Sequence, residues 1–178
     1  MLHGACLPAR PDTGSASPLQ RAWVGIGANL GDAAATVDAA LLALAALPGC
    51  TLAGTSPRYR SAPVDAGGPD FINAVAALDT TLAPLALLAA LQGIEHSFGR
   101  QRPYRNAPRT LDLDLLLHGH TVLHTRVLTL PHPRLHQRAF VLRPLLDLNP
   151  TLVAPGLGLL ADWLPATAGQ TIAALPAR

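Results

Sequence analysis

Apolar residues follow two different spacings along the chain, and the change from one to the other predicts alternating strands and helices. Short apolar runs bounded by Gly, Pro or polar clusters are typical of strands, whereas leucines recurring every three or four residues are typical of helices. We therefore expect strands over 22–26, 51–59, 71–80 and 110–117, a short one near 122, and helices over 33–47, 84–98 and 138–147. The order β-α-β-β-α-β, without an internal repeat, favours an α+β sandwich with helices against a mainly antiparallel sheet.

The helix boundaries carry signals of their own. Asp32 can cap the first helix, which Pro48-Gly49 should end, and Pro84 suits the first position of a second helix that stops at Gly99. The leucines and one phenylalanine expected on the apolar faces of these two helices are Leu41, Leu42, Leu44 and Leu47, then Leu85, Leu88, Leu91 and Phe98. From Pro155 onward the pattern is too weak to predict an element.

Residues 1–20 differ in composition from the rest of the chain. They are rich in Pro, Ser, Gly and Ala and lack the apolar stretch of a signal peptide, which favours a disordered leader before a single domain over 21–178. Nowhere does an apolar run approach the ~18 residues of a membrane span. We therefore expect a cytoplasmic protein that does not insert into a membrane.

Composition narrows the chemistry that the chain can perform. All 13 basic side chains are Arg, so there is no Lys for a P-loop or a Schiff base. Any phosphate must be held by guanidinium groups, backbone N–H groups or metal ions. The net charge of +2 is too small to suggest nucleic-acid binding, yet eight of the Arg lie within 100–143 beside only two acids. Such a basic zone indicates either an anionic-ligand site or a solvated face.

The two acids of that zone, Asp112 and Asp114, are two positions apart in a predicted strand. Alternate strand residues share a face at a spacing of about 6–7 Å, so both carboxylates should point one way while Leu111, Leu113 and Leu115 point into the core. Carboxylates so placed can hold Mg²⁺, and the arginines of the preceding loop can hold phosphate oxygens, as phosphoryl transfer requires. The alternative is a half-exposed edge strand that carries two solvated acids.

The stretch RNAPRTLDLDLL, residues 105–116, resembles the signature of the 6-hydroxymethyl-7,8-dihydropterin pyrophosphokinases of the folate pathway. Further blocks extend the resemblance over about residues 22–155: GANLG at 27–31, YRSAPV at 59–64, FINA at 71–74, QGIE at 92–95 with GR at 99–100, and LPHP at 130–133 with RAF at 138–140. Six ordered blocks are far more specific than any one of them. The resemblance implies a ferredoxin-like α/β/α sandwich, in agreement with the predicted element order.

The resemblance also implies an activity, the transfer of the diphosphate of ATP to the hydroxymethyl group of 6-hydroxymethyl-7,8-dihydropterin with release of AMP. Asp112 and Asp114 would hold two Mg²⁺ ions. Arg100 and Arg109 would contact phosphates during the transfer. The residues at positions that hold ATP in the family are Gln92, Glu95, Arg102, His132 and Arg138.

On the pterin side, the resemblance implies that Phe71 and Phe140 enclose the ring between them and that Asn73 reads its polar edge. The residues that fall where the family lines this pocket are Ser61, Ala62 and Val64. A flat ring with several donors and acceptors suits aromatic faces and an amide. The family resemblance also favours a monomer.

Simpler interpretations stay open for several of these residues. Phe71 and Phe140 could be core residues, Asn73 an edge residue, His132 a loop residue, and Glu95, the only Glu of the chain, a charge on a helix surface. Among the departures of the chain from the family pattern, Phe71 stands for the usual Tyr, Asn106 where some members carry Trp, and Pro103 where some carry Lys. For the whole protein, the alternatives are a Mg-dependent phosphohydrolase and a non-catalytic nucleotide-binding module.

Overall fold

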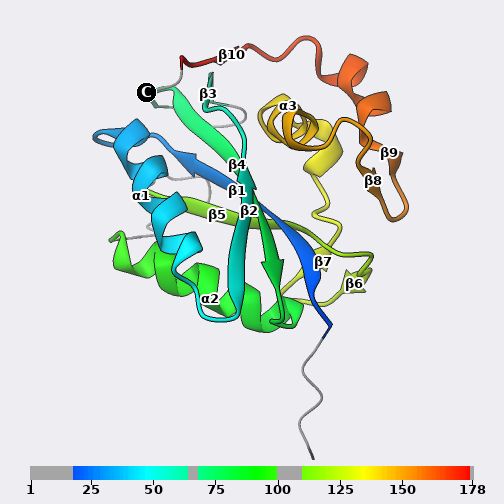
Figure 1. Cartoon of the computed structure of the whole chain (residues 1–178). Coiled ribbons are helices and arrows are strands. Elements are labelled where there is room, and N and C mark those ends of the chain that lie inside the picture. Colours follow the sequence, from blue (N-terminus) through cyan, green and yellow to red (C-terminus); the bar gives the residue numbers. More distant parts are fainter. Residues whose placement is uncertain (1–17, 64–67, 100–109, 177–178) are drawn as a thin grey trace, which may run out of the picture.

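The computed structural model describes residues 18–63, 68–99 and 110–176 (Figure 1). The helices and longer strands are β1 (Gln20–Ala28), α1 (Ala33–Ala45), β2 (Cys50–Thr55), β3 (Tyr59–Ser61), β4 (Phe71–Thr80), α2 (Pro84–Ser97), β5 (Asp112–His118) and α3 (Ala139–Leu148). The shorter elements are β6 (Leu123–His124), β7 (Thr129–Leu130), η1 (Leu135–Gln137), β8 (Val153–Ala154), β9 (Gly158–Leu159), η2 (Leu160–Thr167) and β10 (Ile172–Ala174). Most predicted elements are therefore present, with boundaries shifted by a few residues.

Six strands form one sheet in the order β10-β3-β4-β1-β5, with β2 also paired to β4. The interior strand β1 runs antiparallel to β4, from Gln20 opposite Thr80 to Ala28 opposite Ile72, and antiparallel to β5 on its other side. β2 and β3 pair antiparallel with two successive parts of β4. If β2 and β3 are counted as one interrupted strand, this is the expected ferredoxin-like arrangement.

Helices cover both faces of the sheet, as Figure 1 shows. On one face, here called the α1–α2 face, the fully buried helix residues are Val37, Ala40, Leu44, Leu87 and Leu91. On the other, here called the α3 face, Leu142 and Leu145 of α3 and Leu160 of η2 are fully buried against strand residues that include Val75 and Leu116. The predicted α/β/α sandwich is confirmed, and its core consists mainly of Leu, Ala and Val.

The strand predicted over 51–59 is interrupted between β2 and β3. The hydroxyl oxygen of Ser56 accepts a hydrogen bond from the backbone N–H of Val75 at 2.9 Å, in place of a backbone acceptor. The same hydroxyl donates to the carbonyl of Pro57 at 2.7 Å, and Pro57 itself has no N–H to give to the sheet. These local contacts break the regular ladder, which an apolar pattern alone does not reveal.

The predicted apolar faces are wrong at two leucines, and the end of the chain is more ordered than its pattern suggested. Leu42 is 74% exposed and Leu85 is 51% exposed, because the packing residues are Ala40 and Leu44 in α1 and Leu87 and Leu91 in α2. The stretch from residue 153 forms the β8–β9 hairpin, η2 and β10. Short elements of this kind have too few residues to show a period.

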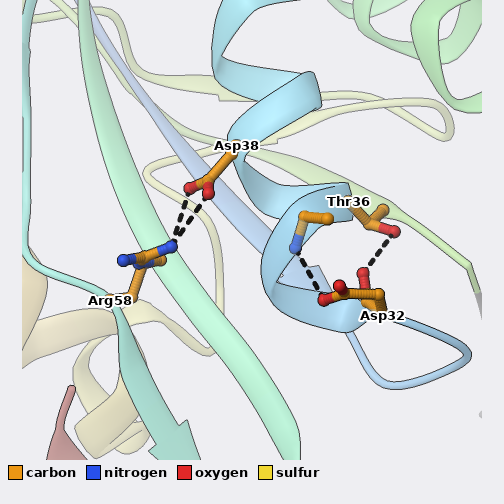
Figure 2. A network of polar contacts seen from close by, with 5 residues as sticks. Asp32, Thr36, Asp38 and Arg58 are labelled. Atoms are coloured by element: carbon orange, nitrogen blue, oxygen red, sulfur yellow. Dashed lines mark hydrogen bonds and ion pairs between the residues drawn. The ribbon is translucent and has the colours of Figure 1, made fainter. Parts of the chain in front are cut away.

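The N-terminus of α1 is held as predicted, and Figure 2 shows how. The Asp32 carboxylate accepts a hydrogen bond from the backbone N–H of Ala35 at 3.0 Å, and the Thr36 hydroxyl donates to the Asp32 carbonyl at 3.0 Å. One turn further on, Arg58 donates to both carboxylate oxygens of Asp38 at 3.1 and 2.9 Å. The pair attaches α1 to the segment between β2 and β3.

Candidate active site

A pocket opens on the α3 face where the end of β1, the start of β4 and the start of β5 lie side by side. Its lining residues come from these strands, from Ser61 and Ala62, and from the start of α3: Gly25, Ile26, Gly27, Ser61, Ala62, Phe71, Asn73, Ala74, Asp112, Asp114, Leu116, Arg134, Arg138, Phe140 and Val141. Eight of the residues that the sequence singled out, Asp112 and Asp114 among them, are therefore brought together in one cavity.

Two glycines of β1 form the floor of this pocket. Gly27 lies opposite Asp112 on β5 and opposite Asn73 on β4, and Gly25 lies opposite Asp114. A Cβ atom at Gly27 would lie 3.4 Å from the Asn73 side-chain oxygen and 3.9 Å from the Phe71 ring. At Gly25 the Leu116 side chain lies 3.4 Å from where a Cβ would be, so the bare part of the floor is at Gly27, between the carboxylates on one side and an amide and an aromatic ring on the other.

The carboxylates of β5 are placed by strand alternation, as the sequence predicted. Leu111, Leu113 and Leu115 are buried on the α1–α2 face at 0%, 4% and 2% exposure. Asp112 and Asp114 alternate with them and line the pocket on the opposite face. The register of β5 against β1 then shifts at Leu116, where the pairing passes from Leu115 to Leu117. This bulge leaves both Leu116 and Leu117 buried in the α3-face core.

The pterin-side candidates lie across the floor from the carboxylates. Asn73 is 4% exposed and donates a side-chain N–H to the hydroxyl of Ser61 at 2.9 Å, which fixes the orientation of its amide. Phe71 lines the pocket from β4, and Phe140 lines it from the first turn of α3. Both rings are only partly buried, and Phe140 also packs against the core of the α3 face.

Arg138 connects the two sides of the pocket. Its guanidinium lies 3.7 Å from an Asp114 carboxylate oxygen, and its central carbon lies 5.5 Å from the centre of the Phe140 ring. The Arg138 side chain is 19% exposed and that of Asp114 is 37% exposed, so both can reach a ligand. The pocket therefore holds the guanidinium of Arg138 close enough to Asp114 for an ion pair, and next to the aromatic face of Phe140.

His132 lies next to this site, in a neighbouring pocket that it shares with Asp114. Burial, reinforced by the positive charge of Arg138, lowers the pKa of the His132 imidazole to about 4, although Asp112 acts in the opposite direction. Its Nδ1 accepts a hydrogen bond from the backbone N–H of Arg134 at 3.2 Å, which the neutral ring can do. His132 is therefore a neutral side chain at pH 7.

Two candidates on α2 lie outside the pocket lining. Glu95 is 1% exposed, and its carboxylate accepts a hydrogen bond from the backbone N–H of Leu113 at 2.8 Å. The interpretation of Glu95 as a helix-surface charge is therefore wrong, since it contacts β5 between Asp112 and Asp114. Gln92 is exposed on the same helix. The remaining candidates, Val64, Arg100, Arg102 and Arg109, lie outside the described residues, as do Pro103 and Asn106.

Some residues of the pocket were not anticipated from the sequence. Gly25 and Arg134 both line it. Glycine at alternate positions 25 and 27 of a strand was a usable signal, because a strand interior that lacks side chains on one face often marks close approach of a ligand. For Arg134 the only signal was its place in the basic zone 100–143, since it precedes a short 3-10 helix in a loop without periodicity.

The carboxylate oxygens in the pocket are suited to bind Mg²⁺. The residues that the structure describes contain no group of three or more His, Cys, Asp or Glu side chains placed to hold a metal ion. Mg²⁺ is usually held by only one or two carboxylates, with waters and substrate phosphates as its other ligands. Asp112 and Asp114, on one face and in one cavity, fit that requirement.

Comparison with known proteins identifies the family. The sequence model of the 7,8-dihydro-6-hydroxymethylpterin-pyrophosphokinase (HPPK) family matches residues 23–150, well over half of the chain. The chain belongs to the HPPK family. A protein of Pseudomonas aeruginosa named 2-amino-4-hydroxy-6-hydroxymethyldihydropteridine pyrophosphokinase is 47% identical over 159 residues, which cover 89% of this chain and 98% of that protein. A protein of the same name from Haemophilus influenzae is 40% identical over 142 residues, or 79% of this chain and 89% of that protein.

Solved structures support the HPPK fold independently of sequence. A Plasmodium falciparum HPPK-DHPS variant, solved with pterin and p-hydroxybenzoate, superposes with a TM-score of 0.69 over 86% of this chain. At 13% identity this likeness concerns the fold alone, and the chain spans 44% of that protein's length. Family membership and fold are thus the ones that the sequence blocks predicted. No helix among residues 18–63, 68–99 and 110–176 is long and apolar enough to cross a membrane.

Proposed function

We propose that the glycine-floored pocket is where this chain transfers the diphosphate of ATP to the hydroxymethyl oxygen of 6-hydroxymethyl-7,8-dihydropterin, giving AMP and the pterin diphosphate. Pyrophosphokinase activity in folate biosynthesis follows from membership of the HPPK family. The observation that carries the residue assignment is the arrangement around Gly27, with Asp112 opposite on one side and Asn73 opposite on the other. This register supports the proposal that phosphate chemistry and recognition of a polar ring take place next to each other.

The pterin would lie on the Asn73 side of the floor. Phe71 and Phe140 offer aromatic faces from the sheet and from α3, and an offset stack on such faces favours a flat ring. Asn73, with one N–H already given to Ser61, presents the rest of its amide to the ring edge. Ser61 and Ala62 close this end of the pocket, and we assign Val64 to the same wall by correspondence with the family.

The diphosphate would lie on the Asp112 side. Asp112 and Asp114 would hold the two Mg²⁺ ions, which when bound offset the negative charge on the phosphate oxygens. Arg138 would hold phosphate oxygens beside Asp114, because its guanidinium already lies 3.7 Å from that carboxylate. We assign Arg100 and Arg109 to phosphate contacts by correspondence with the family. The reaction needs in-line approach of the hydroxymethyl oxygen, which the fixed positions of these groups would provide.

ATP would extend from the pocket toward His132. This residue lines a neighbouring cavity, and Asp114 lines both that cavity and the pocket. A neutral imidazole at this place can exchange hydrogen bonds with a nucleotide without adding charge. We also assign Gln92, Glu95 and Arg102 to ATP binding. Glu95 is 1% exposed and contacts the backbone of β5. It would therefore affect ATP binding indirectly, by holding that strand in position.

We further propose that the protein works as a monomer in the cytoplasm. The monomer is what the resemblance to the family favours. Size-exclusion chromatography with light scattering tests the monomer directly.

The test of the reaction incubates the purified protein with ATP, Mg²⁺ and 6-hydroxymethyl-7,8-dihydropterin, and separates the products by chromatography. AMP and pterin diphosphate should form in equal amounts. Formation of ADP, or of AMP without a pterin product, would contradict the proposal. Phosphate release without transfer would indicate a phosphohydrolase, and ATP binding that does not depend on Mg²⁺ would indicate a binding module. The comparisons favour neither alternative.

A further inference from the structure

The side chain of Gln170 bridges two backbone groups on either side of Arg138. Its Nε2 donates to the carbonyl of Gln137 at 2.7 Å, and its Oε1 accepts from the N–H of Ala139 at 2.9 Å. Gln170 is more than 30 residues away in sequence and follows the end of the family match at residue 150. One amide thus holds the backbone at both flanks of a pocket residue.

The backbone N–H of Ala139, which donates to Gln170, has no acceptor within α3 itself. α3 begins at Ala139, and Arg138 at its N-cap position makes no side-chain capping bond. The first N–H groups of any helix lack an intrahelical acceptor, so they need one from elsewhere. Gln170 supplies that acceptor from a distant segment, and in doing so it fixes where α3 starts.

The start of α3 is also the wall of the proposed active site. Arg138 and Phe140 lie immediately before and after Ala139, and both line the pocket. The guanidinium of Arg138 lies above the Phe140 ring at 5.5 Å and beside Asp114 at 3.7 Å. A rotation of the first turn of α3 would move both side chains at once.

Gln170 is itself held in place by the sheet and by η2. Its backbone N–H donates to the carbonyl of Thr167 at 3.0 Å, at the end of η2. Two residues later β10 begins and pairs with β3, with Ile172 opposite Ser61. Figure 1 shows this C-terminal segment in red, running from η2 to the edge of the sheet at β3. The opposite end of α3 is attached to β3 as well, because the Tyr59 hydroxyl donates to the Asp147 carboxylate at 2.6 Å.

We propose that Gln170 is a positioning residue for the diphosphate transfer: by holding the backbone of residues 137 and 139, it sets the orientation of Arg138 toward phosphate and of Phe140 toward the pterin. The inference rests on the proposed function of the pocket. It assigns a role in catalysis to the segment after residue 150, which the sequence pattern left without any element.

The test compares Gln170→Met, which keeps the length of the side chain and removes both hydrogen bonds, with Gln170→Glu. The glutamate can still accept the Ala139 N–H but cannot donate to the Gln137 carbonyl. We expect kcat to fall by about 10-fold and the KM for the pterin to rise by about 5-fold in Gln170→Met, since small misplacement of reacting groups is costly. In Gln170→Glu, the changes in kcat and in the KM for the pterin should each be at most about half as large as in Gln170→Met, on a logarithmic scale.

A second readout follows the hydrogen bond itself. Amide exchange of Ala139, measured by NMR on the free protein, should be faster in Gln170→Met than in the wild type and protected in Gln170→Glu. A remote destabilising variant, Val37→Ala in the fully buried α1–α2 face, serves as the control for stability. It should lower the midpoint of thermal unfolding and leave kcat and KM at 25 °C unchanged.

The inference is overturned if Gln170→Met shows faster exchange at Ala139 but wild-type kcat and KM, or if Val37→Ala changes the kinetic constants as much as Gln170→Met does. If Gln170→Met does not fold, wild-type kinetics in Gln170→Glu together with unprotected Ala139 would overturn it equally. A wild-type protein that forms no AMP would instead refute the proposed function, and the exchange of Ala139 would still show whether the bridge exists.

Discussion

The two faces of the sheet are made from the same strands, yet they serve opposite purposes. On the α1–α2 face, alternate residues of β1, β4 and β5 are apolar and fully covered by two helices. On the α3 face, the corresponding positions near one end of the sheet are Gly25, Gly27, Asn73, Asp112 and Asp114, and helix cover is partial. The first face provides a continuous core, and the second gives up part of its core to leave a polar cavity.

This difference separates the residues that stabilise the fold from the residues that are proposed to act in catalysis. Because strand residues alternate, a change at one position affects one face and leaves its neighbours on the other face in place. Stability should therefore depend on the α1–α2 face and on the covered part of the α3 face, and catalysis on the exposed part of the α3 face. The following variants test that separation.

The largest effect is expected from Asp114→Ala. Loss of this carboxylate removes a proposed Mg²⁺ ligand, so kcat should fall by at least about 1,000-fold, while the free energy of unfolding changes by less than about 1 kcal/mol. Steady-state assays and urea unfolding measure the two quantities. Asp79→Ala is a matched control, because Asp79 lies on β4 in an ion pair with Arg21 and outside the pocket lining. Unchanged kcat in Asp114→Ala would remove the metal assignment.

The opposite behaviour is expected from Leu87→Ala on α2. Leu87 is 0% exposed, so its truncation should lower the free energy of unfolding by about 2–5 kcal/mol through lost burial and a cavity. The kcat of the folded protein, measured well below the unfolding midpoint, should change less than about 2-fold. Leu85→Ala on the same helix is the control, since Leu85 is 51% exposed and should cost less than about 0.5 kcal/mol. A large loss of kcat in folded Leu87→Ala would show that the two faces are not separate.

A smaller effect should appear when the pH is lowered. The pKa of His132 is about 4 in the folded protein and 6.5 in its ordinary state, so between these values the unfolded chain binds the proton more readily. Stability from this group is therefore complete above pH 6.5 and is lost as the pH falls toward 4, by no more than about 3 kcal/mol. Urea unfolding at pH 7, 6, 5 and 4 should show the decline.

The His132→Gln variant identifies the source of that decline. It should show a shallower dependence of the free energy of unfolding on pH than the wild type does. His124→Gln, at an exposed position of β6, should keep the wild-type slope. Equal slopes in all three proteins would assign the acid sensitivity to other groups.

The smallest effect is expected at the floor of the pocket. Gly27→Ala would place a methyl group 3.4 Å from the Asn73 oxygen, and it should weaken binding of the pterin by about 5-fold because of crowding. The free energy of unfolding should change by less than about 1 kcal/mol. Fluorescence titration with the pterin measures affinity. Gly54→Ala on β2, where a Cβ would lie 3.4 Å from Leu148, should bind the pterin as the wild type does.

The comparison of the two faces also explains what could be predicted from the sequence. Alternation in β5 is a local property, so the directions of Asp112 and Asp114 and the burial of Leu113 followed from their order alone. The interruption between β2 and β3 depends on the hydroxyl of Ser56 meeting a strand 19 residues away. Burial of Glu95 against Leu113 and the contact of Gln170 with Ala139 are likewise contacts between distant segments, which no local spacing encodes.

The position of β5 has a further consequence for how copies of the protein behave toward one another. β5 is an edge strand of the sheet, and an unprotected edge is a template on which a strand of another molecule can add. Here the N–H of Leu113 already donates to the Glu95 carboxylate, and the carbonyl of Leu116 already accepts from the backbone N–H of His132. A foreign strand would have to displace both. The strand that must stay open toward small ligands is thereby guarded against aggregation along its edge.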